Sequence, residues 1–241
     1  MPNLRDCLNG PARSLPQHNE ARPPIAEANA IRQLTETAAK MHPRVHIAHV
    51  SSPAGMEAVA NSSFTAEVAP HHLLLDATMP LKARGKVNPP LRAPGDRAAL
   101  WRGFVDGRIA TLGSDHAPHT VEEKDGSFES APAGVPGVET MGPLSASLLG
   151  LEAGAIELGH FADLVVVDPR EVVAVRAKDL HSKCGWTPFE GFEAVFPQAT
   201  YVRGELAAEG RTLVGERLGK PIASRSPGSP VPALGEAGEP S

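Results

Sequence analysis

The chain has 241 residues, of which 41% are hydrophobic, and a chain of this size can form one sizeable domain with an appendage. Its formal net charge of −5 provides no basic field for nucleic acid, and no apolar run approaches the ~18 residues that a membrane span needs, so neither partner is expected. Cys7 and Cys184 are the only cysteines and lie far apart, which excludes a disulfide framework and, with no signal-peptide core at the N-terminus, favours a cytoplasmic protein.

The first part of the chain alternates helix and strand patterns. Residues 1–22 carry Pro, Gly, Asn and Arg without periodicity, and this predicts an irregular leader. Between Pro24 and Met41 the apolar residues recur at helical spacing, which predicts a surface helix with one buried stripe. Val45–Val50 then alternates as a strand does, and Ala54–Ala60 follows as a short helix.

The same alternation continues after this helix. Phe64–Ala69 has a strand pattern and leads into the apolar run Pro70–Leu75. Asp96–Val105 is predicted to be a helix that runs into the strand Ile109–Gly113. Because strands and helices alternate along the chain, the sequence predicts an α/β fold with a parallel sheet.

The second half of the chain has a different character. After the short apolar stretch Leu144–Leu158, Ala162–Pro169 is a strongly β-branched strand that ends in a turn. Two further strand-like segments, 192–196 and 200–202, precede a hairpin-type turn at Arg203-Gly204. We therefore expect a small β-rich appendage over residues 159–220 and a disordered tail over the Pro-, Ser- and Gly-rich residues 221–241.

An acid and two imidazoles follow the predicted strand Ile109–Gly113. In the run Ser114-Asp-His-Ala-Pro-His119, Asp115 would be the last inward-facing residue of the strand, and His119 would lie one turn further along the loop. This arrangement suits a hydrolytic metal site. An acid at the end of a strand is, however, more often a helix cap or a turn former when it stands alone.

Other polar residues have simpler interpretations. Strand histidines such as His46 and His71 are more often packed or hydrogen-bonded than metal ligands, and we interpret His72 as structural. Glu122–Lys124 is interpreted as a solvated surface run.

Five short motifs resemble those of the class I dihydroorotases in order and approximate spacing. They are His46-Ile-Ala-His-Val-Ser-Ser52, Glu67-Val-Ala-Pro-His-His-Leu-Leu-Leu75, Lys86-Val-Asn-Pro-Pro-Leu-Arg92, Ser114-Asp-His-Ala-Pro-His-Thr120 and Gly134-Val-Pro-Gly-Val-Glu-Thr140. The resemblance covers roughly residues 18–220, and the strand Ala162–Pro169 is similar to one in the C-terminal β domain of that family. These enzymes are amidohydrolases, a superfamily that also contains allantoinases and hydantoinases.

The resemblance implies a fold and a set of roles. Residues 23–158 would form part of a TIM-type (β/α) barrel, its C-terminal strands only. His49 would be a ligand of the active-site zinc, and Asp115 would bind zinc and carry a proton from the attacking hydroxide to the leaving ring nitrogen. Asn88 and His119 would hydrogen-bond the substrate, which Ala133 and Gly134 would approach through their backbone. The implied reaction is the interconversion of dihydroorotate and N-carbamoyl-aspartate in pyrimidine biosynthesis.

The sequence also departs from the family pattern. The family's His-x-His pair, its bridging Asp or carboxylated Lys and a further His ligand have no counterpart here. Only 48 residues precede His49, whereas each strand-helix unit of a barrel takes roughly 30, so an N-terminal truncation is expected, with an internal deletion between Thr140 and Gly159. Two protein ligands cannot hold a catalytic zinc, which normally has three, and the chain is expected to be inactive alone.

Three readings of the function stay open. The chain would be an incomplete dihydroorotase that acts on a small cyclic amide, a related hydrolase of the allantoinase or hydantoinase type, or a non-catalytic pseudo-enzyme. The pseudo-enzyme would serve as a scaffold, for example for aspartate transcarbamoylase. An uncovered sheet edge would favour association with such a partner or with a second copy of the chain.

Overall fold

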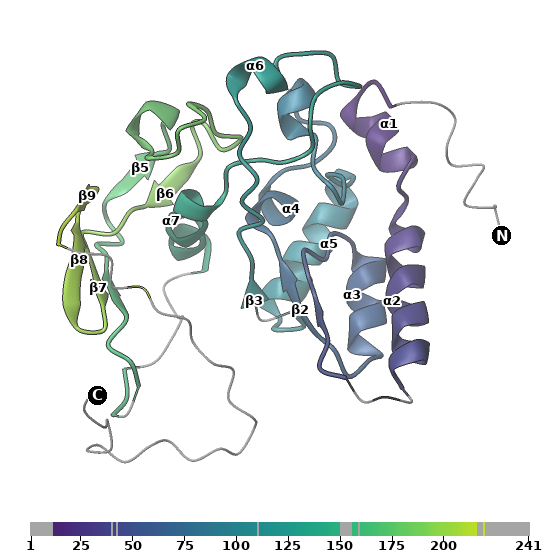
Figure 1. Ribbon diagram of the computed structural model, residues 1–241, viewed down its shortest axis with the longest axis horizontal. Helices are drawn as coiled ribbons and strands as arrows, with labels where there is room; N and C mark the ends of the chain where they lie inside the picture. Colours follow the sequence, from purple (N-terminus) through teal and green to yellow (C-terminus); the bar gives the residue numbers. More distant parts are fainter. Residues whose placement is uncertain are drawn as a thin grey trace, which may run out of the picture. The chain divides into compact units, whose positions relative to one another are not determined.

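The computed structural model describes residues 12–39, 41, 43–109, 111–149, 156–158, 160–215 and 219 (Figure 1). The predicted tail at 221–241 and the first eleven residues of the predicted leader lie outside the described residues. The described chain divides into two compact units, one formed by residues up to Ser145 together with Ala174–Phe192, and the other by Ala146–Val173 and the residues from Glu193 onward. The boundary predicted near residue 158 falls within a segment of the second unit.

The first unit contains a three-stranded sheet and most of the helices. Its elements are α1 (Leu15–Glu20), α2 (Pro24–Ala38), β1 (His46–Ile47), α3 (Pro53–Ala60), β2 (Thr65–Val68), α4 (Pro70–Leu74), the 3-10 helix η2 (Lys82–Gly85), α5 (Pro94–Val105), β3 (Thr111–Leu112), α6 (Val121–Lys124), the start of α7 (Val138–Leu149) and the 3-10 helix η3 (Ala177–Asp179). The sheet has the order β1-β2-β3 and is parallel throughout, with His46 opposite Thr65 and Glu67 opposite Thr111. The α/β prediction with a parallel sheet is confirmed.

One part of the expected leader is helical. Residues 15–20 form α1, where an irregular segment was predicted. The side chain of Ser14 accepts a hydrogen bond from the backbone N–H of Gln17, and a proline stands in the first turn. Both are signals of a helix start, but the helix is too short to show a periodic apolar pattern.

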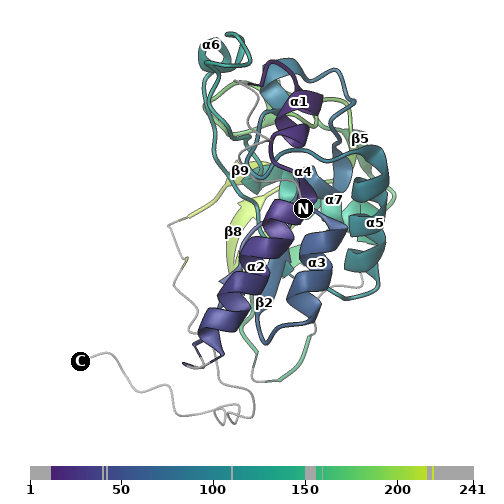
Figure 2. The same cartoon turned by 90° about the vertical axis from the view of Figure 1, so that its right-hand side faces the viewer.

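The core of the first unit lies between the sheet and three helices. Figure 1 and Figure 2 show α2, α3 and α5 together, with α2 and α3 side by side. Buried apolar residues from all three helices meet those of the sheet: Ala28, Ile31, Met56, Ala58, Val59, Ala66, Val68, Leu100 and Ile109. Helices α3 and α5 approach closely at Gly103, where a Cβ would lie 2.2 Å from the sulfur of Met56. On β2, buried Ala66 and Val68 alternate with Thr65 and Glu67, so polar side chains line the opposite face of the sheet.

The second unit is built of short strands. Strands β4 (Leu164–Val166), β7 (Ala199–Val202), β8 (Glu205–Glu209) and β9 (Thr212–Leu213) form an antiparallel sheet in the order β4-β7-β8-β9. Strands β5 (Val172–Ala174) and β6 (Glu193–Val195) pair separately. Arg203 and Gly204 connect β7 to β8 with positive φ angles of 55° and 86°, as the predicted hairpin turn requires. Among the described residues, no helix combines the length and the apolar character needed to cross a membrane.

Candidate active site

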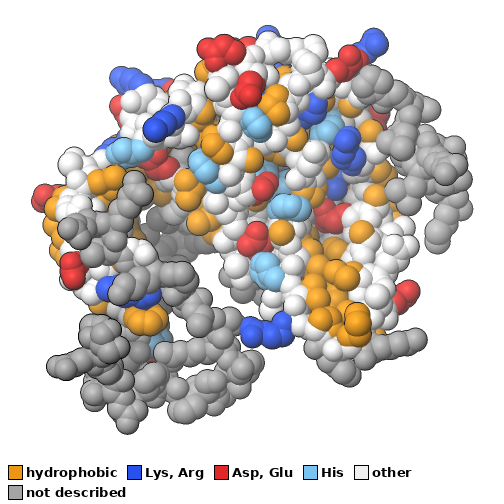
Figure 3. Space-filling model, viewed as in Figure 1, with side chains coloured by type: hydrophobic (Ala, Val, Ile, Leu, Met, Phe, Trp, Pro, Cys, Tyr) orange, Lys and Arg blue, Asp and Glu red, His pale blue; other side chains and the backbone are white. Residues whose placement is uncertain are grey.

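The predicted metal ligands lie just beyond the carboxyl ends of parallel strands. His49 follows β1 by two residues, and Asp115 follows β3 by three. Both have a positive φ, 40° for His49 and 42° for Asp115, which is costly for residues other than glycine and is characteristic of functional sites. Figure 3 shows histidine and acidic side chains close together on the face that it presents. Because the carboxyl ends of parallel strands share one edge of the sheet, the two residues lie at the same edge.

Asp115 has a neutral histidine as its buried neighbour. The Nε2 atom of His71 lies 3.6 Å from Oδ2 of Asp115, and only 1% of the His71 side chain is exposed. Burial lowers the pKa of His71 to about 3, with His49 adding to the effect. At neutral pH the contact therefore joins a neutral imidazole to a carboxylate and is not a salt bridge.

The carboxyl group of Asp115 is partly withdrawn from water. Its side chain is 29% exposed, and burial raises its pKa. His49 opposes this rise, whereas the carboxylate of Glu67 adds to it. Glu67 itself points across the sheet toward His46, whose Nε2 lies 3.4 Å away. A carboxylate with a raised pKa is better suited to exchanging protons than a fully solvated one.

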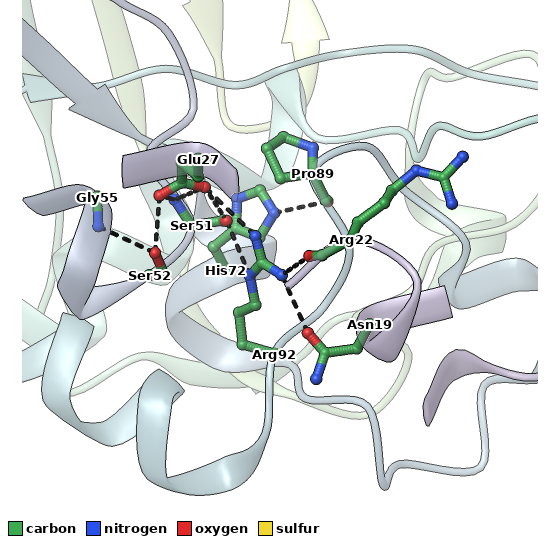
Figure 4. A network of polar contacts seen from close by, with 9 residues as sticks. All are labelled: Asn19, Arg22, Glu27, Ser51, Ser52, Gly55, His72, Pro89 and Arg92. Atoms are coloured by element: carbon green, nitrogen blue, oxygen red, sulfur yellow. Dashed lines mark hydrogen bonds and ion pairs between the residues drawn. The ribbon is translucent and has the colours of Figure 1, made fainter. Parts of the chain in front are cut away.

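A buried polar network fixes the loop that carries His49 (Figure 4). Glu27 of α2 accepts hydrogen bonds from the backbone N–H and hydroxyl of Ser51, and from the hydroxyl of Ser52 at 2.9 Å. Arg92 donates from Nε to the Ser51 hydroxyl at 3.0 Å and lies 3.4 Å from Glu27 Oε2. Its other donors reach Asn19 and the carbonyl of Arg22. The ion pair is largely buried, and its hydrogen bonds attach the loop after β1 to α2 and to Arg92.

Asn88 lies on the same side of the site as His49. Both residues line a cleft of about 450 Å³, together with Arg22, Pro89 and Arg92 among others. The Oδ1 atom of Asn88 is 3.1 Å from Nε2 of His18, a buried residue of α1. The peptide bond between Asn88 and Pro89 is cis, and the carbonyl of Pro89 lies 3.0 Å from Nε2 of the buried His72. The interpretation of His72 as structural agrees with this contact.

His119 and the pair Ala133-Gly134 are brought together. Nε2 of His119 lies 3.3 Å from the carbonyl oxygen of Ala133. Gly134 has a φ of 142°, and a Cβ there would lie 2.6 Å from the carbonyl oxygen of Ala117 and 3.2 Å from Cδ2 of His119. Only glycine allows this approach, which explains its place beside His119.

The burial of Lys124 differs from the prediction. We expected Glu122–Lys124 to be a solvated run, but Lys124 is 1% exposed. Its Nζ donates to the carbonyl oxygens of Lys86, Pro132 and Gly134 at 3.2, 2.9 and 3.1 Å. Helix α6 turns its two glutamates to solvent and its lysine inward, and a run of three charges gives no sign of which one is buried.

The structure thus groups the predicted residues and adds others. It places Asp115 within the electrostatic reach of His49, gives His49 and Asn88 a common cleft, and joins His119 to Ala133 and Gly134. In the part of the chain that the structure describes, no three His, Cys, Asp or Glu side chains gather so that they could hold a metal ion. Sequence reasoning missed His71 as a neighbour of Asp115. Its position at the start of α4, shortly after the carboxyl end of β2, was a signal that could have found it.

The chain is similar to known dihydroorotases. It matches no protein-family profile. It is 42% identical to the dihydroorotase of Halobacterium salinarum over 217 residues, which cover 80% of this chain and 51% of that protein. It is 39% identical to the dihydroorotase of Methanosarcina acetivorans, covering 84% of this chain and 51% of the relative. The chain therefore spans about half the length of the curated relatives it matches, and the predicted resemblance to dihydroorotases is confirmed.

Solved structures of hydantoinases are similar in fold to this chain. A D-hydantoinase from Thermus sp. has a TM-score of 0.75 at 25% identity, covering 85% of this chain and 53% of its own. An L-hydantoinase from Arthrobacter aurescens has a TM-score of 0.76 at 24% identity, covering 88% and 55%. The fold of this chain is similar to part of these amidohydrolases.

Proposed function

We propose that this chain, which is similar to dihydroorotases over most of its length, supplies part of the active site of a hydrolase that interconverts dihydroorotate and N-carbamoyl-aspartate. The observation that supports this most is the position of His49 and Asp115 beyond the ends of β1 and β3, two parallel strands of one sheet, at the edge where α/β enzymes place their catalytic residues. In the proposal the sheet and its helices are the C-terminal strands of a (β/α) barrel, and the antiparallel strands are an appendage.

Asp115 is the proposed proton carrier. Its partial burial and raised pKa suit a carboxylate that accepts a proton from the attacking water and returns it to the ring nitrogen as the C–N bond breaks. The neutral His71 beneath it provides no cation that would hold the carboxylate ionised.

The substrate would lie between the two groups of residues around Asp115. Asn88, at the His49 cleft, offers an amide that can hydrogen-bond a ring carbonyl or N–H. On the other side, His119 and the backbone of Ala133 and Gly134 would contact the same small cyclic amide.

Zinc is the metal that the resemblance implies, and the described residues fit it incompletely. A catalytic zinc has three protein ligands, whereas the described residues offer His49 and Asp115 without a third at the same point. The buried Nε2 of His71 has no hydrogen-bond partner, but it faces Asp115 from within the protein core. Further ligands would have to come from outside the described residues.

Ligand titration tests the substrate assignment. Dihydroorotate added to the full chain should shift the NMR signals of His119 and Gly134, and hydantoin should do so more weakly. Asn88→Ala and His119→Ala should each weaken binding about tenfold, because each removes a hydrogen bond to a buried ligand. Glu57→Ala, at an exposed position on α3, serves as the control. Unchanged spectra with dihydroorotate, or tighter binding of hydantoin, would contradict the assignment.

Zinc titration tests the metal assignment separately. We expect the chain to retain less than one equivalent of zinc after gel filtration, because two ligands hold the ion weakly. Stoichiometric retention that His49→Ala abolishes would show a fuller ligand set than the described residues contain.

A non-catalytic role is the second candidate. The observation that favours it is the lack of a three-ligand metal group among the described residues. A scaffold would bind aspartate transcarbamoylase or a second copy of itself. Replacing Asp115 by Asn would leave the affinity for that partner unchanged. Light scattering after size-exclusion chromatography, with the wild type and Asp115→Asn in parallel, distinguishes this role from catalysis.

A further inference from the structure

The buried ammonium of Lys124 donates hydrogen bonds to three main-chain carbonyls. The acceptors are the oxygens of Lys86, Pro132 and Gly134, and an ammonium group has three N–H donors. Two of these partners flank Ala133, and Lys86 in turn accepts a hydrogen bond from the N–H of Gly134 at 2.9 Å. Lys124 therefore links the two backbone segments that define the position of Gly134, one at Lys86 and the other at Pro132–Gly134.

Lys86 reinforces the same segment from its other end. Its Nζ donates to the carbonyl oxygens of Phe128, Glu129 and Ala131, at 2.8, 3.1 and 2.7 Å. Together the two lysines bond to five carbonyls between Phe128 and Gly134. This segment has no strand or helix of its own to fix it, so side-chain donors replace backbone pairing.

Trp186 connects Lys124 to His119. The indole N–H of Trp186 donates to the carbonyl oxygen of His119 at 2.7 Å, and Nζ of Lys124 lies 5.7 Å from the centre of its ring. Trp186 is 3% exposed, so the cation–π contact is desolvated and correspondingly strong. One buried cluster thus fixes His119 on one side and Pro132–Gly134 on the other.

We propose that Lys124 is a positioning residue, which fixes the Pro132–Gly134 segment beside His119 through its three carbonyl contacts. The role of that segment in binding a cyclic amide rests on the proposed function. The positioning itself does not, because it follows from the contacts of Lys124 alone. An ordinary core lysine would pair with a carboxylate and would not depend on the conformation of one loop.

The protonation of Lys124 gives the proposal a characteristic pH dependence. Burial, with Lys86 nearby, lowers the pKa of Lys124 to about 8. Arg84 is a further cation close to the cluster; it lies 5.9 Å from the Trp186 ring and is paired with Asp125 at 2.8 Å. If the loop opens and exposes Lys124, its pKa returns toward ~10.4, so the open form binds more protons between these values. Opening is therefore disfavoured as the pH rises above 8.

Hydrogen exchange at the Gly134 amide tests the proposal in the full chain. Lys124→Met should lower the protection factor of this amide about tenfold, because it removes charge-assisted hydrogen bonds from two of the carbonyls beside it. The Val50 amide donates to the carbonyl oxygen of Glu67 at 2.9 Å and lies far from Lys124 in the sequence. Its protection factor should be unchanged. Lys178→Met removes an exposed lysine from η3 and should change neither amide.

The pH profile separates positioning from a general loss of stability. In the wild type the protection factor of Gly134 should rise between pH 8 and pH 9.5, by at most about tenfold per pH unit. In Lys124→Arg, which stays charged, the rise should be absent while protection at pH 7 is largely kept.

Two results would overturn the proposal. The first is unchanged Gly134 protection in a folded Lys124→Met variant. The second is a flat wild-type profile, which decides the question even if Lys124→Met does not fold. Neither measurement depends on substrate turnover, so failure of the proposed reaction and failure of this inference remain distinguishable.

Discussion

The imidazole of His71 lies 3.6 Å from the carboxylate of Asp115, and the two groups do not form an ion pair. Burial keeps the imidazole neutral by lowering its pKa to about 3. It is also among the few described side chains with a buried nitrogen that lacks a hydrogen-bond partner. Asp115 is thus held at the boundary between solvent and a neutral, apolar interior, which accounts for the direction of its pKa shift.

His71 should make the protein sensitive to acid. Its pKa is about 3 in the folded protein and ~6.5 when unfolded, so the unfolded state binds more protons between these values. Stability is therefore fully present above pH 6.5 and falls with decreasing pH, by up to about 1.4 kcal/mol per pH unit for this group. In His71→Gln, which stays neutral, urea unfolding should show a shallower loss between pH 6.5 and pH 4. His72, whose pKa burial also lowers, leaves a residual slope. An identical pH dependence in the variant would contradict the assignment.

The carboxylate of Glu67 should help to set the pKa of Asp115. Burial is the main cause of the raised pKa, and Glu67 adds to it by repulsion. Glu67→Gln should move the Asp115 pKa downward without restoring its ordinary value, because burial remains. Carbon-13 NMR titration of the Asp115 carboxyl measures this shift, and Glu57→Gln at an exposed position provides the control. An upward shift in Glu67→Gln would show that the two carboxylates do not repel each other.

The ion pair between Glu27 and Arg92 should be strongly coupled. Arg92 is 3% exposed and Glu27 12%, so removing one partner leaves an uncompensated buried charge. We expect Arg92→Met to lower the free energy of unfolding by about 3–5 kcal/mol, and the double variant Glu27→Gln/Arg92→Met to cost less than the sum of the single changes. Urea unfolding of the wild type, the two single variants and the double variant completes this double-mutant cycle. Strict additivity would show that the network in Figure 4 does not act as a unit.

The sequence predicted the elements well where a local pattern determines them. The alternation in Val45–Val50 identified β1, and helical spacing identified α2, because packing against the core follows that periodicity. Some predicted element ends differ from the observed ones. Helix α2, for example, ends at Ala38, whereas the predicted helix ends at Met41. The hairpin at Arg203-Gly204 was predictable because Gly204 adopts a positive φ without strain, although Arg203 also has a positive φ.

The site was only partly predictable, for a physical reason. Asp115 and His119 share a short motif, but the burial of Lys124 and the contact between His71 and Asp115 depend on which loops meet at the edge of the sheet. The ring of Trp186 lies 5.7 Å from Nζ of Lys124, and His71 and Asp115 are likewise far apart in the sequence, so no local spacing reports these contacts.

Gly134 should be the least replaceable glycine of the site. Its φ of 142° is strained for any L-amino acid with a side chain, and a Cβ would lie 2.6 Å from a backbone oxygen that cannot move aside cheaply. Gly134→Ala should therefore lower the free energy of unfolding by about 1–3 kcal/mol and shift the NMR signals of His119, whose Cδ2 would be 3.2 Å from the new Cβ. Gly142→Ala is the matched control, because a Cβ at that helical position meets nothing within 4 Å and should stabilise α7 by up to about 1 kcal/mol. If both variants unfolded at the same urea concentration as the wild type, the close approach of Gly134 to Ala117 and His119 would be wrong.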